Sequence, residues 1–367
     1  MRRFRDYYRQ FEAMTPEEVS RELRARHEAD KRRALSPIRR LDLSGTAWHE
    51  PPHAEAVNAA TFALRRALHA YPAADGGPAR AAVAARHGLA PASVVLGHGA
   101  GELLRAACAT LLGRGGDALV AGPGWHPLPA LVEAAGGRPV PLALASDGAP
   151  DAAALAAAAS APRVRAVLLC GPNDPTGAPL ARAALAELCA RVPERVTVVL
   201  DAALAEFASA ADDPAALAGE VPNLLVVRSF SKAHALAGLR AGAALGPPAL
   251  VARLAPSGGL GAPVQAAVAW AASDAGTAVA ARRRAAAAAS RRQLATALAG
   301  SALFLAPGAA PFAWLSSRAE DGQALAARLA ASRILVAPGR LWGDERHVRA
   351  ALGGPEVVGR LVDALVG

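Results

Sequence analysis

The sequence is poor in cysteine and in aromatic residues, and it has no long apolar run. Only three cysteines occur, and the spacing of Cys108, Cys170 and Cys189 suits neither a metal site nor a disulfide framework. We therefore interpret them as buried free thiols and expect no metal site. No segment reaches the roughly 20 strongly apolar residues of a membrane span, and the charged N-terminus lacks the apolar core of a secretory signal. We expect a cytoplasmic protein without membrane contact.

The excess of positive charge is concentrated at the N-terminus. Residues 1–40 hold 12 Lys+Arg and 7 Asp+Glu, which gives +5 out of a formal net charge of +9. The two signs mix at helical spacing, and Thr15 and Glu18 form a candidate capping box. We interpret this segment as a basic helical arm that faces solvent or a partner. Nucleic acid is not an expected partner, because no binding motif accompanies the charge.

From about residue 93, short apolar runs alternate with alanine- and leucine-rich stretches, separated by Gly and Pro. The apolar runs are continuous, which indicates strands covered on both faces in a mostly parallel sheet. The candidate strands are 93–97, 117–121, 138–144, 165–171, 196–201 and 223–229. We predict an α/β fold in which helices flank this sheet.

A chain of 367 residues is long enough for a large and a smaller domain with a cleft between them. After about residue 247 the pattern changes to long alanine- and arginine-rich helix, followed by short strands and a final helix over 355–366. We predict an arm at 1–40, a large domain at 41–246 and a smaller α+β domain at 247–367. Residues 41–60 are expected in the large domain or packed on the smaller one.

Lysine is almost absent, because only Lys31 and Lys232 are lysines among 40 Lys+Arg residues. The chain uses arginine wherever charge alone is needed, so the presence of a lysine at position 232 needs a chemical explanation. An amine can attack a carbonyl carbon, whereas a guanidinium stays protonated and is a poor nucleophile. The alternative is an incidental surface lysine.

Lys232 lies in RSFSKAHALAGLRAG, directly after a candidate strand, at the edge where open α/β sheets bind ligands. Ser229, Ser231 and Arg240 add two hydroxyl groups and a guanidinium, which suit a phosphate. The segment resembles the S-x-S-K…L-x-G-L-R signature of fold-type I, class I/II aminotransferases, in particular their histidinol-phosphate aminotransferase branch. The resemblance implies that Lys232 holds pyridoxal 5'-phosphate as a Schiff base, and that the two serines and Arg240 bind its phosphate.

Further segments follow in the order found in that family. VLGHGAGELL places Gly99, Ala100 and Gly101 before a helix, where backbone N–H groups and the helix dipole can bind a phosphate. The resemblance gives these three residues that role. It also places Trp125 of GPGWHP on the cofactor ring, the alternative being an ordinary tryptophan of the core.

The resemblance assigns roles to three more residues. Asp201, at the end of VTVVLD, pairs with the ring nitrogen and keeps it protonated, unless it is a loop or capping aspartate. Tyr71 of HAYP reaches the phosphate in the neighbouring subunit, which implies a homodimer with shared active sites. Arg349 of HVRAAL binds the substrate α-carboxylate. Arg340 is a second candidate for this role, and a surface salt bridge is the alternative.

Two residues depart from the family pattern around the phenolic oxygen of the cofactor. In GPNDPTG, Asp174 takes the cofactor-binding position of an asparagine, and in DAAL, Leu204 replaces a tyrosine. An ionised Asp174 only accepts hydrogen bonds and would repel a phenolate, unless it keeps a proton or turns away. We predict a raised pKa of the Lys232 Schiff base if Asp174 stays anionic beside it. The early loop SGTAWHEP, which often contacts the substrate in this family, also departs from the family's N-E-N-P. The resemblance therefore does not identify the substrate.

The resemblance covers roughly residues 41–367 and implies an aminotransferase. Such an enzyme moves an amino group between an amino acid, or an amino-phosphate compound, and a 2-oxo acid, with Lys232 as acid and base. The first alternative is a decarboxylase or lyase resembling threonine-phosphate decarboxylase, because orientation of the substrate decides which bond breaks. The second alternative, suggested by Asp174 and Leu204, is a catalytically degenerate protein that binds the cofactor.

Overall fold

The computed structural model describes residues 14–21, 23–25, 40–256 and 258–366. By its internal contacts the chain separates into two units, residues 1–41 and 42–367, and each is described by itself. In the first unit, residues 16–21 and 23–25 are helical. The predicted capping box is confirmed, since Glu18 N donates to Thr15 Oγ1 at 3.3 Å and Thr15 N donates to Glu18 Oε2 at 2.9 Å. Most of the remaining predicted arm lies outside the described residues.

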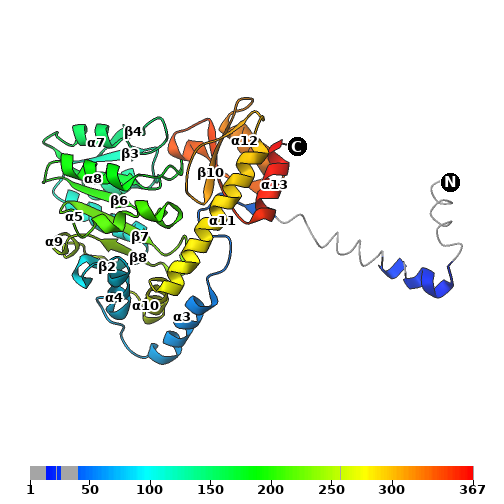
Figure 1. Cartoon of the computed structure of the whole chain (residues 1–367), viewed down its shortest axis with the longest axis horizontal. Helices are drawn as coiled ribbons and strands as arrows, with labels where there is room; N and C mark the ends of the chain where they lie inside the picture. Colours follow the sequence, from blue (N-terminus) through cyan, green and yellow to red (C-terminus); the bar gives the residue numbers. More distant parts are fainter. Residues whose placement is uncertain (1–13, 22, 26–39, 257, 367) are drawn as a thin grey trace. The chain divides into compact units, whose positions relative to one another are not determined.

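A seven-stranded sheet lies at the centre of the larger part of the second unit (Figure 1). In spatial order its strands are β2 (Val94–Gly97), β8 (Gly242–Leu245), β7 (Leu224–Ser229), β6 (Thr197–Asp201), β5 (Val164–Cys170), β3 (Asp117–Gly122) and β4 (Arg138–Ala143). Strands β3 to β7 run parallel, whereas β8 is antiparallel to its neighbours β2 and β7. The predicted α/β fold with a mostly parallel sheet is confirmed, and the six candidate strands agree with the structure to within one residue at each end. Strand β8 was not predicted, because its glycine, alanine and leucine residues include no β-branched side chain.

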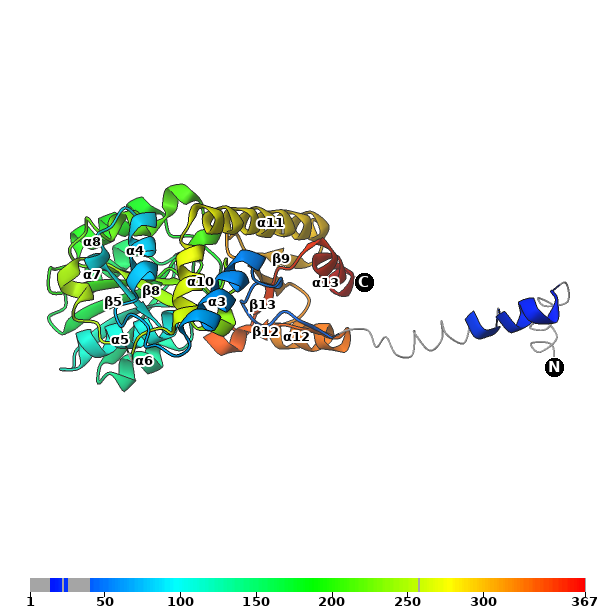
Figure 2. The ribbon, with the colours of Figure 1, turned by 90° about the horizontal axis from the view of Figure 1, so that it is seen from below.

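Helices cover both faces of this sheet (Figure 2). One face carries α4 (Gly77–Arg86), α7 (Ala152–Ala158), α8 (Arg182–Arg191) and α10 (Ala262–Ala271). The other face carries α5 (Ala100–Leu112), α6 (Leu128–Ala134) and α9 (Pro248–Val251). The edge strand β4 holds only half-buried and exposed residues, so the expectation of cover on both faces is wrong for this strand. Helices α9 and α10 pack on the large sheet although they follow residue 247.

A second, antiparallel sheet lies in the C-terminal part of the chain (Figure 1). Its strands, in spatial order, are β12 (Ala337–Pro338), β13 (His347–Ala351), β10 (Phe312–Ser317) and β9 (Leu303–Leu305). Helices α12 (Gly322–Ala331) and α13 (Pro355–Val366) accompany it, and the short strands β1 (Leu41–Asp42) and β11 (Ile334–Leu335) form a further pair. Leu43 joins this region, since its N donates to Leu335 O and its O accepts from Ala351 N, both at 2.8 Å.

The long helix α11 (Asp274–Leu298) runs from the large sheet to the smaller one (Figure 1). Its N-cap Ser273 accepts a hydrogen bond from Gly276 N, and its many alanines favour helix. Helix α3 (Ala54–Ala67) packs against α10, where Trp270 Nε1 donates to Glu55 Oε2 at 3.0 Å. No helix within the described residues has both the length and the apolar character needed to cross a membrane.

Phe312 of β10 and Phe304 of β9, two phenylalanines on neighbouring strands of the antiparallel sheet, provide a matched test of its packing. Phe312 is fully buried, whereas 56% of Phe304 is exposed. Because truncation of a core side chain loses apolar contact and leaves a cavity, Phe312→Ala should lower the free energy of unfolding by about 3–5 kcal/mol. Phe304→Ala should change it by about 0.5 kcal/mol or less. Urea denaturation followed by circular dichroism measures both values, and equal losses would contradict this assignment of the core.

Candidate active site

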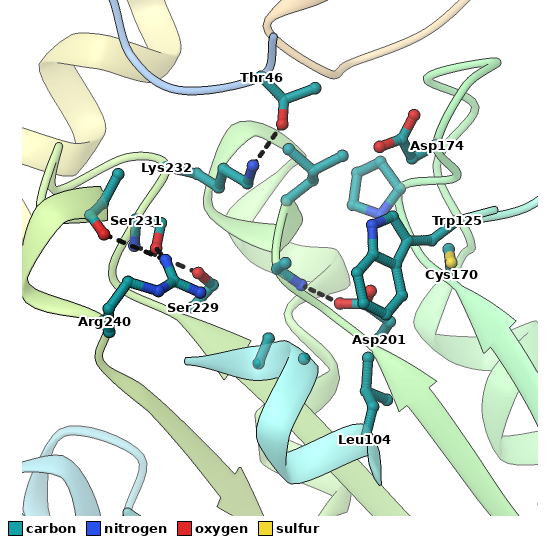
Figure 3. A pocket seen from close by; sticks show the side chains of 16 residues that line it. Thr46, Leu104, Trp125, Cys170, Asp174, Asp201, Ser229, Ser231, Lys232 and Arg240 are labelled. Carbon is teal, nitrogen blue, oxygen red and sulfur yellow. Dashed lines mark hydrogen bonds between the residues drawn. The ribbon is translucent and has the colours of Figure 1, made fainter. Parts of the chain in front are cut away.

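A pocket lies at the carboxyl ends of β5, β6 and β7, beside the first turn of α5 (Figure 3). Ligands bind at this edge in open parallel sheets. The lining residues are Thr46, Ala100, Gly101, Leu104, Trp125, Cys170, Pro172, Asp174, Asp201, Ala203, Leu204, Ser229, Ser231, Lys232, Ala237 and Arg240. Most of the residues singled out in the sequence are therefore brought together, although they are spread over more than 130 positions.

One end of the pocket collects groups that bind anions. The first N–H groups of α5 have no partner within the helix, and the N-cap is Gly99 with φ at 89°. Arg240 lies against this turn, because a Cβ placed on Gly99 would come within 2.8 Å of Arg240 Nη2. Arg240 Nη1 donates to Ser231 Oγ at 3.5 Å, and Ser231 N donates to Ser229 Oγ at 3.2 Å. A helix N-terminus, two hydroxyl groups and a guanidinium thus meet, which suits a phosphate.

The other end of the pocket contains a buried carboxylate. Asp201 ends β6, is 8% exposed, and accepts a hydrogen bond from Ala203 N at 3.0 Å. Burial raises the pKa of Asp201 to about 6, and the negative charge of Asp174 adds to this rise. A cationic partner, such as a protonated ring nitrogen, would stabilise the ionised form of a carboxylate in this position.

Trp125 lies beside the first turn of α5, near Asp201 (Figure 3). A Cβ placed on Gly101 would lie 3.3 Å from the indole, so the ring rests on the first turn of α5. Trp125 lines the pocket together with Asp201 (Figure 3). The flat indole can therefore cover a flat ligand in the pocket.

Lys232 points into the pocket from the segment after β7 (Figure 3). Its Nζ donates to Thr46 Oγ1, a residue of the early loop that the sequence did not indicate. Burial lowers the pKa of Lys232, while the charges of Asp174 and Asp201 oppose this shift. A lowered pKa increases the fraction of neutral amine, which is the nucleophilic form.

A buried ion cluster supports the segment that carries Lys232. Glu206 accepts from Arg86 Nη2 at 3.0 Å, lies 3.0 Å from His234 Nε2, and is 3.5 Å from Arg228 Nη2. Burial would raise the pKa of Glu206, but His234, Arg228 and Arg86 outweigh it, so the pKa is lowered. Because His234 is only two residues from Lys232, this cluster helps to fix the lysine's position. No pattern in the sequence indicated this cluster.

Helix α11 holds the same segment from another side. Arg283 is buried, and its Nη1 donates to Ala233 O at 2.9 Å while its Nη2 donates to Pro51 O at 2.8 Å. One guanidinium therefore ties the residue next to Lys232 to the early loop. This explains how Thr46 and Lys232 come to be neighbours.

Asp174 lines the pocket, but its carboxylate forms an ion pair with Arg349 of β13. Arg349 Nη1 donates to Asp174 Oδ1, and Nη2 donates to Ser44 O at 2.8 Å. Leu204 also lines the pocket and packs in an apolar cluster with Phe207. Both residues that depart from the family pattern thus line the pocket, and the partner of Asp174 is Arg349.

Four predicted residues are not part of the pocket lining. Gly99 and Arg349 lie against lining residues, Arg240 and Asp174 respectively, whereas the other two are exposed. Tyr71 is fully exposed, and Arg340 is exposed in the short 3-10 helix η6 (Gly339–Trp342). Sequence reasoning in turn missed Thr46, Leu104 and Cys170, which do line the pocket. Cys170 ends β5 and could have been found from its place at the strand end. Thr46 lies in the early loop SGTAWHEP, which the sequence analysis noted only for its departure from the family pattern. All three cysteines are free and buried, as interpreted from the sequence.

Comparison with known proteins identifies the family. Residues 42–365 match the family model described as aminotransferase class I and II. The chain belongs to this family. Its members depend on pyridoxal phosphate, and the predicted resemblance is thereby confirmed.

Several relatives illustrate the match. Histidinol-phosphate aminotransferase 2 of Ralstonia nicotianae is 33% identical over 317 residues, which cover 84% of this chain and 83% of that protein. The aromatic amino acid aminotransferase of Cutibacterium acnes is 36% identical over 199 residues, 54% of this chain and 56% of that protein. In several such matches the chain spans only about half the length of the curated relative, for example 50% of a histidinol-phosphate aminotransferase of Cereibacter sphaeroides.

The fold agrees with solved structures of this family. Histidinol-phosphate aminotransferase from Sinorhizobium meliloti, in complex with pyridoxal-5'-phosphate, superposes with a TM-score of 0.79 at 24% identity, covering 89% of each chain. This likeness confirms the fold. The pocket of the present chain fits such a cofactor by its own chemistry, because an anion-binding end, a buried carboxylate and an amine line one cavity. No cluster of three or more metal-ligating side chains occurs in the part of the chain that the structure describes.

The raised pKa of Asp201 predicts a pH dependence of stability in the cofactor-free protein. Because the pKa rises from 3.8 to about 6 on folding, the protonated carboxyl stabilises the fold below pH 3.8, and this contribution is lost as the pH rises through about 6. Relative to Asp201→Asn, the wild type should lose roughly 3 kcal/mol of unfolding free energy across this window, at about 1.36 kcal/mol per pKa unit. Denaturant titrations at a series of pH values measure the free energy of unfolding of both proteins. If this free energy has the same pH dependence in the wild type and in Asp201→Asn, the raised pKa of Asp201 is refuted.

Proposed function

We propose that this protein is a pyridoxal-phosphate-dependent aminotransferase. It would move an amino group between an amino acid, or an amino-phosphate compound, and a 2-oxo acid. The observation that carries the proposal is the meeting of Lys232, Asp201 and the anion-binding turn around Gly99 in a single pocket. Membership of the aminotransferase family supports it.

The proposed roles follow from the placement of each group. Lys232 would hold the cofactor and, once the substrate amine takes its place, would move the proton at the substrate's amino carbon. Asp201 would hold the ring nitrogen in its protonated form, which offsets the cost of burying this carboxylate. Bound pyridoxal phosphate would supply the electron sink for the charge left when a bond at that carbon breaks.

The remaining residues would bind and orient. Gly99, Ala100, Gly101, Ser229, Ser231 and Arg240 would bind the phosphate, and Trp125 would cover the ring. Asp174 would stand near the phenolic oxygen of the cofactor, and Arg349 would lie on the side of the pocket where the substrate binds. A fixed substrate orientation matters because the bond that stands perpendicular to the ring is the one that breaks.

We also propose a cytoplasmic homodimer in which Tyr71 serves the neighbouring subunit's site. Tyr71 is fully exposed, and Phe62 and Leu68 nearby in sequence are 61% and 78% exposed, so an apolar surface is available for a partner. A second subunit would bury the exposed apolar side chains.

We further propose that the chain divides into an arm at 1–40, a large domain at 41–246 and a small domain at 247–367.

Replacement of Lys232 tests cofactor binding. Lys232→Ala, and equally Lys232→Arg, should abolish the visible absorption band of lysine-bound pyridoxal phosphate, since neither side chain is a competent amine. Lys31→Ala changes the only other lysine in the sequence and should keep the band. A band that survives in both Lys232 variants would overturn the role of this lysine.

A half-transamination screen tests the reaction. The cofactor-loaded protein, mixed with a panel of amino acids and amines, should lose the visible band with at least one donor and release the matching oxo compound. Release of carbon dioxide with the band retained would instead indicate decarboxylation. No reaction with any donor would contradict the proposed aminotransferase.

A further inference from the structure

The ion pair between Asp174 and Arg349 joins two buried residues, which are 9% and 8% exposed. Arg349 comes from β13 and Asp174 from the segment after β5, so the pair spans 175 positions of sequence. Asp174 lines the pocket beside Lys232 and Asp201. Asp174 therefore stands between Arg349 and any ligand in the pocket.

The guanidinium of Arg349 is fixed in place. Its Cζ lies 4.7 Å from the centre of the Trp342 ring and 5.3 Å from the centre of the Phe312 ring. Nη2 donates to Ser44 O, while Nε is buried and has no hydrogen-bond partner among the described residues. Arg349 cannot turn away from Asp174 without losing these contacts.

The backbone around Asp174 is fixed as well. Asn173 is fully buried, and its Nδ2 donates to Pro123 O at 2.9 Å and to Thr176 Oγ1 at 3.1 Å. Asn173 N donates to Ala178 O at 2.8 Å, and Asn173 O accepts from Gly177 N at 2.8 Å. Only rotation of the Asp174 side chain itself could release Arg349.

A substrate carboxylate would bind a guanidinium through two N–H groups. Both terminal nitrogens of Arg349 already donate, one to Asp174 and the other to Ser44. A second carboxylate must share Arg349 with Asp174 or displace it, and it brings a further negative charge close to Asp201. Like charges in a buried site repel strongly, so this arrangement is unfavourable.

We infer that Asp174 is a specificity residue that occupies Arg349 in place of a substrate carboxylate. It thereby favours amino compounds that carry an uncharged polar group, such as a primary amide, where an amino acid carries its α-carboxylate. The inference rests on the proposed function, because it assigns the kind of substrate for the same pocket. An asparagine at position 174 would leave Arg349 without an anionic partner and open to carboxylates.

A binding experiment tests this without turnover. Propanoate and propanamide have nearly the same size and differ in charge, and calorimetry measures their affinity for the cofactor-loaded wild type and for Asp174→Asn. We expect Asp174→Asn to bind propanoate about ten-fold more tightly than the wild type does, and propanamide within about two-fold. Equal affinity of both proteins for propanoate would overturn the inference.

Two further variants serve as controls for this experiment. Asp151→Asn makes the same chemical change at the N-cap of α7 and should leave both affinities unchanged. Asp174→Ala also removes the carboxylate and should strengthen propanoate binding, so the test stands even if Asp174→Asn fails to fold. A gain in Asp151→Asn equal to that in Asp174→Asn would show a general charge effect and overturn the specific role.

Donor specificity supplies a second readout. For the best amino acid found by half-transamination and its primary amide, the ratio of kcat/KM for amide over acid should fall by about ten-fold or more in Asp174→Asn. An unchanged ratio would contradict the inference. If no donor reacts with either protein, the proposed function fails, and the calorimetric comparison alone decides the role of Asp174.

Discussion

Buried charge at the carboxyl edge of the parallel strands is the constraint on which the rest of the pocket depends. Lys232, Asp201, Asp174 and Arg349 lie within one region that water reaches poorly. A buried charge is costly unless it is paired. Asp174 and Arg349 meet this cost by pairing with each other, whereas burial raises the pKa of Asp201 and lowers that of Lys232. Asp201 and Lys232 are the groups that a cofactor with a basic ring nitrogen and an aldehyde would engage.

The surrounding structure holds these charges at fixed positions. The strands bring Asp201 and Ser229 to the same edge, and the left-handed backbone of Gly99 and Arg240 lets the guanidinium approach the first turn of α5. Glu206 joins His234, two residues from Lys232, to arginines from α4 and β7. Arg283 of α11 adds the link to the early loop. A site built this way depends on elements from both sheets.

Much of this arrangement could be predicted from the sequence because its signals are local. Apolar runs mark the buried strands, and the scarcity of lysine makes Lys232 conspicuous. Strand β8 escaped prediction because small residues alone do not distinguish strand from loop. The contact of Thr46 with Lys232 and the pairing of Asp174 with Arg349 also escaped, since both join segments at least 175 residues apart. Such partners are set by tertiary packing, which no local pattern reports.

The central claim is that Lys232 is the residue that holds pyridoxal phosphate. Borohydride reduction of the cofactor-loaded protein makes a lysine–cofactor bond permanent, and peptide mass spectrometry then locates it. The sequence offers only two lysines, Lys31 and Lys232, so the assignment is unambiguous. We predict the mass of the reduced cofactor on the peptide that contains Lys232 and its absence from the peptide that contains Lys31. Modification of Lys31 alone, or of neither lysine, would contradict the account.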